Sequence, residues 1–347
     1  MRRIYQFIFV MFIFIVSLLA TPTLFAQRGG RATETLEVKL ASPLPKESPW
    51  GRTLDKIAVE WNRITNGQVR LNVRHGGVEG NEQKMHLSLA SDIIQAAVFT
   101  SFGLNKIEKS VMTLSAPFLI RNEAELSAVM REVQGDLERK ISSGNYFMLA
   151  WSKSGFVNIF SKDQVLTPDD LKRMKIASQA EASDMNDAFK AMGFQVVETD
   201  MGEIGNKLNA GTIAACYQNP AAIAAFQLHS ILKNMLQVNI APVLGGIVMN
   251  QITWRKIGDL NPRYQTELLN STRKIAEEFD ASLQKTVSDA VQTMSRAGLK
   301  VNQPSAAQAQ LWYNEMEKVV PVLLGSAFDR DLYNRVNSIL VRYRGGR

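Results

Sequence analysis

The sequence has few of the residues on which redox, metal-binding and catalytic proteins depend. Its only cysteine is Cys216, so no intramolecular disulfide can form and stability must come from apolar cores. The three histidines, His75, His86 and His229, lack a paired metal-ligand spacing such as HExxH. No segment has the glycine spacing of a nucleotide-binding loop, and no nucleophile, base and oxyanion donor come together. We therefore expect no enzymatic activity, metal or cofactor.

Long apolar runs are also scarce. The sequence has one, and it lies near the N-terminus. Arg2 and Arg3 precede it, residues 21–23 (TPT) break it, and the segment ends on the small residue Ala26, which is the order of a secretory signal peptide. The run is shorter than the ~20 residues of a membrane-spanning helix, although an uncleaved anchor is an alternative. We expect residues 1–26 to be a signal peptide, residues 27–35 a flexible leader, and the remainder an exported periplasmic protein.

The net charge of +7 is not concentrated in one place. The basic residues are scattered along the predicted helices instead of being massed with aromatic residues. A surface that binds nucleic acid usually shows a clustered basic stripe. The pattern favours a solvated basic surface, and we expect no nucleic-acid partner.

Strand and helix patterns alternate along most of the chain. Residues 36–40 alternate as in a half-buried strand, residues 49–64 place apolar side chains on one helical face, and residues 69–73 alternate again. Farther on, Thr167 and Pro168 have the order of a helix cap and first turn. Strands separated by helices predict an α/β fold with parallel-rich sheets flanked by helices. Further strands are expected at 146–151, 156–160 and 243–249.

The length predicts two lobes, since a chain of this size exceeds one compact core. From Pro262 to Ala297 there is no glycine, and apolar residues recur at steps of four, which predicts a helix about 50 Å long. A second helical region follows and is expected to bend near Pro321. The expected divisions are lobe I at 36–153 and 243–261, lobe II at 154–242, a cross-lobe helix at 262–298, and a C-terminal strand and helices at 299–347 that pack on both lobes.

Several segments resemble one protein family in order and spacing. Residues 166–176, LTPDDLKRMKI, resemble the TPEDLKGLKI signature of the DctP-type binding proteins of TRAP (tripartite ATP-independent periplasmic) transporters. The resemblance implies a two-lobed periplasmic binding protein that closes a hinged cleft on a ligand and delivers it to a membrane permease. The other matching segments are 67–71 (GxVxxxV), 116–120 (lPFLf), 208–213 with 218–220 (LqtGvvDgqeNP), and Asn250 with Trp254 (NkxxW).

The chain departs from this family where the family binds carboxylates. The resemblance places an arginine after the KI of the signature and another in a GFR strand, but Ala177 and Val157 stand there. A buried carboxylate without a cation carries a desolvation cost of several kcal/mol. The position that is often aromatic in the family is Met201. We therefore expect a hydrophobic or neutral ligand. The arginine-less pattern is similar to a subgroup that works with a periplasmic tetratricopeptide-repeat protein, which is a further expected partner.

The expected ligand contacts combine aromatic, apolar and amide side chains. Some of the aromatic residues, such as Phe99, Trp151 and Phe156, could equally be ordinary core. The predicted set is Trp50, Phe99, Phe102, Trp151, Phe156, Val157, Ala177, Met201, Gln218, Asn219 and Leu244.

Two other functions stay open at this point. The chain could bind an organic acid through another basic residue such as Arg52. It could instead be a periplasmic scaffold or sensor whose cleft is vestigial, and a periplasmic enzyme is a more distant alternative.

Overall fold

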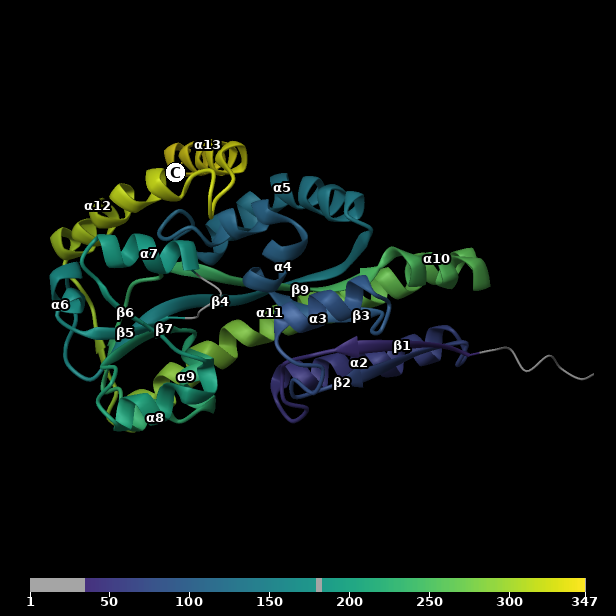
Figure 1. The fold of residues 1–347 in the computed structure, drawn as a ribbon, viewed down its shortest axis with the longest axis horizontal. Helices are drawn as coiled ribbons and strands as arrows, with labels where there is room; N and C mark the ends of the chain where they lie inside the picture. Colours follow the sequence, from purple (N-terminus) through teal and green to yellow (C-terminus); the bar gives the residue numbers. More distant parts are fainter. Residues whose placement is uncertain (1–34, 179–182, 347) are drawn as a thin grey trace, which may run out of the picture. The chain divides into compact units, whose positions relative to one another are not determined.

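The computed structural model describes residues 35–178 and 183–346 (Figure 1). The expected signal peptide and most of the expected leader lie outside these residues. No helix in the described part of the chain is long and apolar enough to cross a membrane.

The first half of the fold is built on a mixed sheet in the order β2-β1-β3-β9-β4. β1 pairs in parallel with β2 and β3, whereas β9 runs antiparallel to both β3 and β4. The alternation predicted for residues 36–40 and 69–73 is present in β1 and β2. The bounds are β1 Leu36–Ala41, β2 Val69–Arg74, β3 Ala96–Thr100, β4 Tyr146–Ser161 and β9 Ala241–Asn250.

The second half continues from β4 in the order β4-β7-β5-β6. β5 is parallel to both β6 and β7, β7 is antiparallel to β4, and a short pair of β8 and β10 joins β4 through β8. The α/β class predicted from the sequence is confirmed, with antiparallel pairings at β4 and β9 among the parallel ones. The bounds are β5 Lys175–Ser178, β6 Gln195–Glu198, β7 Ala215–Gln218, β8 Asn234–Leu236 and β10 Lys300–Asn302.

β4 is one strand where the sequence predicted two. Its first part pairs with β9 and its last part with β7 and β8, so it belongs to both halves. The register shifts between Lys153 and Phe156, and Gly155 in this bulge has a φ of 80°. The prediction of a break was wrong because glycine adopts this left-handed conformation freely and lets the strand bend without ending.

Helices cover both faces of the first sheet. Ser48 caps α2 by accepting a hydrogen bond from the backbone of Gly51, and the fully buried Trp61 donates from Nε1 to Thr272 Oγ1 at 2.8 Å. One core cluster joins α3, α4, η1 and α5 to this sheet, and another joins α2, α10 and the start of α11 to it. The bounds are α2 Pro49–Ile64, α3 Glu82–Ala90, α4 Ser101–Ile107, the 3₁₀ helix η1 Lys109–Ser115, α5 Glu123–Ser143 and α10 Gln251–Leu260.

The second half has a core on each face of its strands as well. Thr167 and Asp170 form a reciprocal capping box at the start of α6, as the sequence order indicates. Cys216 is buried among apolar side chains, and burial raises the pKa of its thiol to about 12. The bounds are α6 Pro168–Lys172, α7 Ser183–Ala191, η3 Met201–Glu203, α8 Ile204–Asn209, α9 Pro220–Ala225 and η4 Leu228–Ser230.

The predicted long helix is present as α11, which spans Pro262–Arg296. It contacts α2 and α10 of the first half, β4, and α9 of the second half (Figure 1). Asn261 caps its start and Pro262 occupies its first turn, so the helix begins where the sequence places it.

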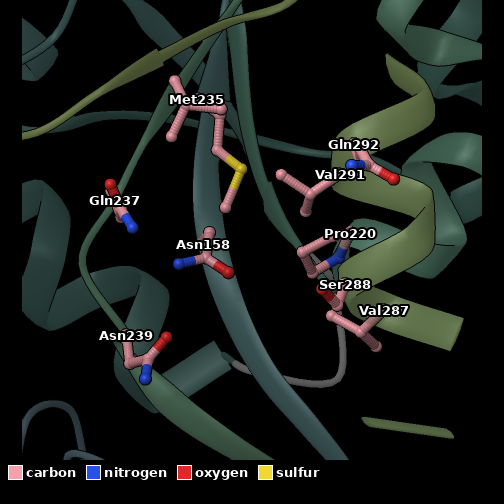
Figure 2. Close-up of a pocket in the computed structure, with 10 residues that line it drawn as sticks. Asn158, Pro220, Met235, Gln237, Asn239, Val287, Ser288, Val291 and Gln292 are labelled. Carbon is pink, nitrogen blue, oxygen red and sulfur yellow. The ribbon is translucent and has the colours of Figure 1, made fainter. Parts of the chain in front are cut away.

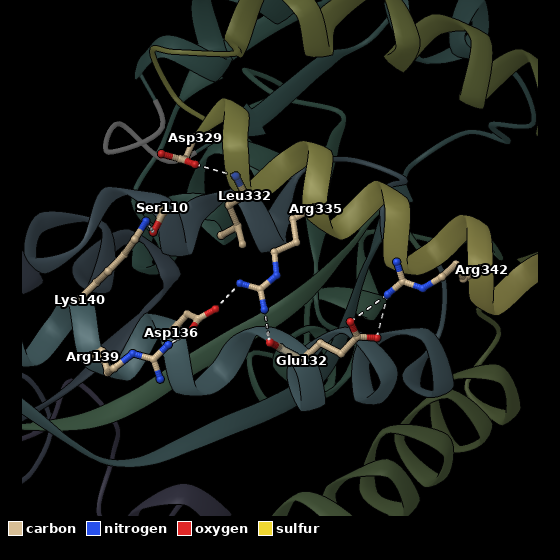
Figure 3. A network of polar contacts seen from close by, with 9 residues as sticks. All are labelled: Ser110, Glu132, Asp136, Arg139, Lys140, Asp329, Leu332, Arg335 and Arg342. Atoms are coloured by element: carbon tan, nitrogen blue, oxygen red, sulfur yellow. Dashed lines mark hydrogen bonds and ion pairs between the residues drawn. The ribbon is translucent and has the colours of Figure 1, made fainter.

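The C-terminal region forms two helices, α12 (Ala306–Leu323) and α13 (Arg330–Gly345), in place of one bent helix. Pro321 lies inside α12, close to its end, and Asp329 caps α13 by accepting from the backbone of Leu332. α13 docks on α5 through arginines that reach its acidic side chains, including Arg335 to Asp136 and Arg342 to Glu132 (Figure 3).

Candidate functional site

Strand ends from both halves converge on one part of β4. Ser152 of β4 pairs with Gly245 of β9, which in turn pairs with Thr100 at the end of β3. On the other side, Asn158 pairs with Gln218 at the end of β7. Open α/β folds bind ligands outside the carboxyl ends of their strands. The residues Ser152–Val157, here called the junction segment, therefore mark the candidate site.

A neutral cluster of hydroxyl and amide groups lies at the ends of β5 and β7. Ser178, which is 4 % exposed, donates from Oγ to Asn186 Oδ1 at 2.5 Å and shares a hydrogen bond of 3.0 Å with the Tyr217 hydroxyl. Burial raises the pKa of Tyr217, so its hydroxyl stays protonated at neutral pH. This cluster can exchange hydrogen bonds with a ligand without contributing a charge.

The junction segment is held from two sides. Asp280 of α11 accepts from Ser152 Oγ at 3.0 Å and from the Lys153 backbone at 2.9 Å. On the other side, Asn219 donates from Nδ2 to the Ser154 carbonyl at 2.6 Å, while its Oδ1 caps α9. α11 and the start of α9 thus fix the bend of β4 between the two halves.

Two carboxyl groups and one ammonium group interact at the junction segment. Burial raises the pKa of Asp280 to about 6, although the hydrogen bond from the Lys153 backbone opposes the shift. Burial also raises the pKa of Glu123 at the start of α5, and the charge of Lys153 partly opposes that shift. Lys153 has two acidic neighbours, so an anionic ligand would compete with both carboxyl groups for its ammonium.

Five of the predicted contact residues are packed inside apolar cores. Each of them is at most 8 % exposed, and Trp151 also donates from Nε1 to Glu138 Oε1 at 3.1 Å. These side chains pack against their neighbours, and contact with a ligand stays a prediction for them. The five are Phe99, Trp151, Phe156 and Leu244 in the core of the first half and Ala177 in a core of the second.

Other predicted residues lie nearer to solvent or at the junction segment. Trp50 is half-buried and packs edge-on against Phe279, the neighbour of Asp280 in α11, with ring centroids 6.0 Å apart. Phe102, Val157 and Gln218 are half-buried, Asn219 holds the junction segment, and the backbone of Met201 lies in η3.

Sequence reasoning missed Ser178, Tyr217, Lys153 and Asp280. Asp280 had a detectable signal, since it falls four residues after Ala276 in the buried stripe of α11, where an acid needs a partner. The others follow only from the strand ends and from the course of β4, which the sequence pattern had divided in two.

The fold and the candidate site together define an α/β binding protein, with strands from two halves meeting at a polar junction. The chain belongs to the DctP family, the bacterial extracellular solute-binding proteins of family 7, whose family model matches residues 40–324. This assignment confirms the prediction of a solute-binding protein that serves transport and is not an enzyme.

Individual relatives are distant in sequence but similar in fold. A solute-binding protein of Chromohalobacter salexigens is 22% identical over 278 residues, or 77% of this chain and 80% of that protein. A TRAP periplasmic solute-binding protein from the same species, with bound D-glucuronate, gives a TM-score of 0.79 at 18% identity and covers 87% of this chain and 99% of that one. A TRAP periplasmic solute-binding protein from Ralstonia eutropha, with bound (S)-2-acetolactate, gives a TM-score of 0.79 at 19% identity. The match covers 88% of this chain and 99% of that one. At these identities the likeness establishes the fold.

Proposed function

We propose that the chain is the extracytoplasmic solute-binding component of a TRAP-type transporter and that it binds a neutral ligand at the junction segment. The transporter class rests on family membership and on the solved structures of the same fold, which are described as TRAP periplasmic proteins. The expected partners are the membrane permease and, for the arginine-less subgroup, a tetratricopeptide-repeat protein. The expected location is the periplasm.

The observation that carries the ligand class is the absence of a guanidinium at the two positions where the family pairs carboxylates. Val157 and Ala177 occupy them, and Ala177 is 4 % exposed within an apolar core. Lys153, the cation of the junction segment, has the carboxyl groups of Asp280 and Glu123 as charged neighbours. The glucuronate and acetolactate complexes of the solved relatives contain organic acids, so this chain would differ from them in ligand charge.

The positions of the side chains favour a polar neutral ligand over a hydrophobic one. Four of the apolar side chains expected to line the site are core residues of the first half, whereas the strand ends carry Ser178, Tyr217 and Gln218. Uncharged hydroxyl and amide groups recognise hydroxyl-bearing or amide-bearing molecules through hydrogen bonds of about 1 kcal/mol each.

The first test is native mass spectrometry of the purified protein, followed by denaturing extraction of any bound molecule. A neutral molecule would support the proposal, and an organic acid would contradict the proposed charge of the ligand. The extracted molecule then serves in thermal unfolding of variants. Tyr217→Phe should weaken its binding about tenfold, which removes about 1.4 kcal/mol of ligand-induced stabilisation at saturation.

The matched control is Tyr264→Phe, which removes a hydroxyl bonded to Gln68 on the α2 side, away from the junction segment. It should leave the ligand-induced stabilisation unchanged. Arg52→Ala separates the open alternatives, because an acid binder that depends on Arg52 would lose the stabilisation, whereas a neutral binder keeps it. No stabilisation by any ligand in the wild-type protein would favour the scaffold alternative.

A further inference from the structure

A pocket beside the last part of β4 is lined by Asn158 of that strand and by residues of α11 (Figure 2). Asn158 lines it, and neighbouring residues in a strand point to opposite faces, so this pocket and Val157 are separated by the sheet. Its volume is about 410 Å³, and its walls come from β4, β8, α9, α11 and β10. Pockets that bind small molecules have volumes of about 300–1,000 Å³.

Asn158 supplies an acceptor that the described residues leave unused. The side chain is 4 % exposed, and its Nδ2 donates to the Val238 carbonyl at 2.8 Å, which fixes the remaining polar atom as the amide oxygen. Within the described chain no group donates to this oxygen. In Figure 2 the oxygen points towards Pro220 and Ser288 across the pocket. Because this oxygen opens into the pocket, a donor on a bound molecule can take the place of solvent there.

The remaining walls are uncharged and combine apolar side chains with the polar side chains of Gln237, Asn239, Ser288 and Gln292. Met235, Val287 and Val291 present aliphatic and thioether groups, and none of the described residues that line the pocket ionises at neutral pH. An anion would meet the lone pairs of the Asn158 oxygen and find no cation among these residues.

We propose that this pocket is a second ligand site, distinct from the junction segment, for a neutral small molecule that carries a hydroxyl or primary amide on an apolar body. The donor binds the Asn158 oxygen, and the body packs between Met235 and the α11 valines. An occupant would tie α11 to β4 and β8, so its binding raises the stability of the folded chain.

The test uses benzamide and benzoate, which have the same shape but differ in the donor and the charge. The protein is labelled with ¹³C at its methionine methyl groups, and the Met235 signal is assigned with Met235→Leu. Benzamide should shift the Met235 methyl signal in a saturable way, and benzoate should bind at least about tenfold more weakly. The shift should persist in Tyr217→Phe, which removes a hydroxyl group from the neutral cluster at the ends of β5 and β7.

Two tryptophan variants on α11 complete the design. Ser288→Trp places a large side chain into the pocket from an exposed position and should abolish the benzamide shift. Asp289→Trp changes the next residue, which is exposed and paired with Lys285. This variant should still show the benzamide shift of the Met235 signal. The proposal is overturned if benzamide leaves the Met235 signal unmoved up to about 20 mM, a limit that corresponds to very weak binding. An equal response to benzoate, or a shift that survives in Ser288→Trp, would overturn it as well.

Discussion

Asp280 is a buried acid whose environment only partly compensates its charge. It lies in the buried stripe of α11 between Ala276 and Leu283, and burial raises the pKa of its carboxyl group to about 6. Its charged neighbours are Lys153 on β4 and Glu277 on its own helix, with Glu123 of α5 nearby. The folded chain therefore holds a proton on this residue at pH values where the unfolded chain has released it.

The first residue-scale prediction concerns Asp280→Asn. Between the unfolded pKa of 3.8 and the folded value of about 6, the folded state binds more protons, so this group lowers the free energy of unfolding as the pH rises. Asparagine can still accept from the Lys153 backbone and can donate to Ser152 Oγ. Between pH 4 and pH 7, the free energy of unfolding of the wild type should fall by up to about 3 kcal/mol relative to that of the variant.

Urea unfolding of both proteins at the two pH values measures this difference. Asp289→Asn, an exposed change on the same helix, is the control and should show the pH dependence of wild type. Parallel pH profiles for wild type and Asp280→Asn would show that the carboxyl group is ionised at no cost to the fold.

Two residue-scale features of the candidate site were predicted from the sequence, and their contact with a ligand stays a prediction. Val157 and Ala177 could be aligned with the arginine positions of the family because the surrounding motif is long. The sequence could not decide between core packing and ligand contact for Phe99, Trp151, Phe156 and Leu244, since an apolar residue beside a strand end has the same pattern whether it faces a ligand or a helix.

At the scale of elements, α13 is fixed to α5 by one ion pair that differs from the others. Arg344 donates from Nε and Nη2 to the two oxygens of Glu125, at 3.0 and 2.8 Å, and from Nη2 to the Leu119 carbonyl at 2.9 Å. The Glu125 side chain is 6% exposed. Burial alone would raise the pKa of Glu125, but the Arg344 hydrogen bond and charge outweigh burial and lower it.

Arg344→Ala should destabilise the protein by about 2–4 kcal/mol at neutral pH, because it leaves a buried carboxylate without its cation. Since the pKa of Glu125 is lowered in the folded state, the stabilisation is present above the unfolded pKa of 4.5 and disappears as the pH falls through the folded value. The difference between wild type and variant should therefore shrink in acid.

Denaturant unfolding at neutral and acidic pH tests this prediction, with Arg335→Ala as the control. Arg335 is 45% exposed where it pairs with Asp136 (Figure 3), so its loss should cost less than about 1 kcal/mol. Equal effects of the two substitutions would mean that the Glu125 pair is no stronger than a surface pair.

At the scale of the whole molecule, the bend of β4 decides how the two halves are joined. Gly155 has a φ of 80°, and a Cβ there would lie 3.3 Å from Asn219 Nδ2 and 3.7 Å from a Val287 methyl group. Gly155 therefore lies at the bend of β4 and next to both Asn219 and α11. A substitution that strains its backbone is expected to displace residues of the candidate site.

Gly155→Ala should cost about 1–2 kcal/mol of stability for the left-handed backbone and should also weaken ligand binding, because it displaces the Asn219 side chain. Gly193→Ala is the matched control: its φ is 87°, but no atom lies within 4 Å of the added methyl group. Thermal unfolding with and without the extracted ligand separates the two effects. Equal ligand-induced stabilisation in both variants would contradict a role of the bend in binding.

The sequence by itself determined the local elements and the class of the protein. Cap residues, apolar periodicity and the absence of glycine between Pro262 and Ala297 are local signals, and they predict helices and strands because each depends on neighbours along the chain. The family resemblance added the function class, because its motifs extend over most of the chain.

Only the tertiary structure decided which side chains face one another. β4 crosses from one half to the other, Asp280 reaches it from more than a hundred residues away, and the Asn158 oxygen opens into a pocket beside α11. These contacts join segments that are distant in sequence, and one strand bulge changes the face that a side chain takes. Burial, pKa shifts and pockets follow from that three-dimensional arrangement, which local patterns do not encode.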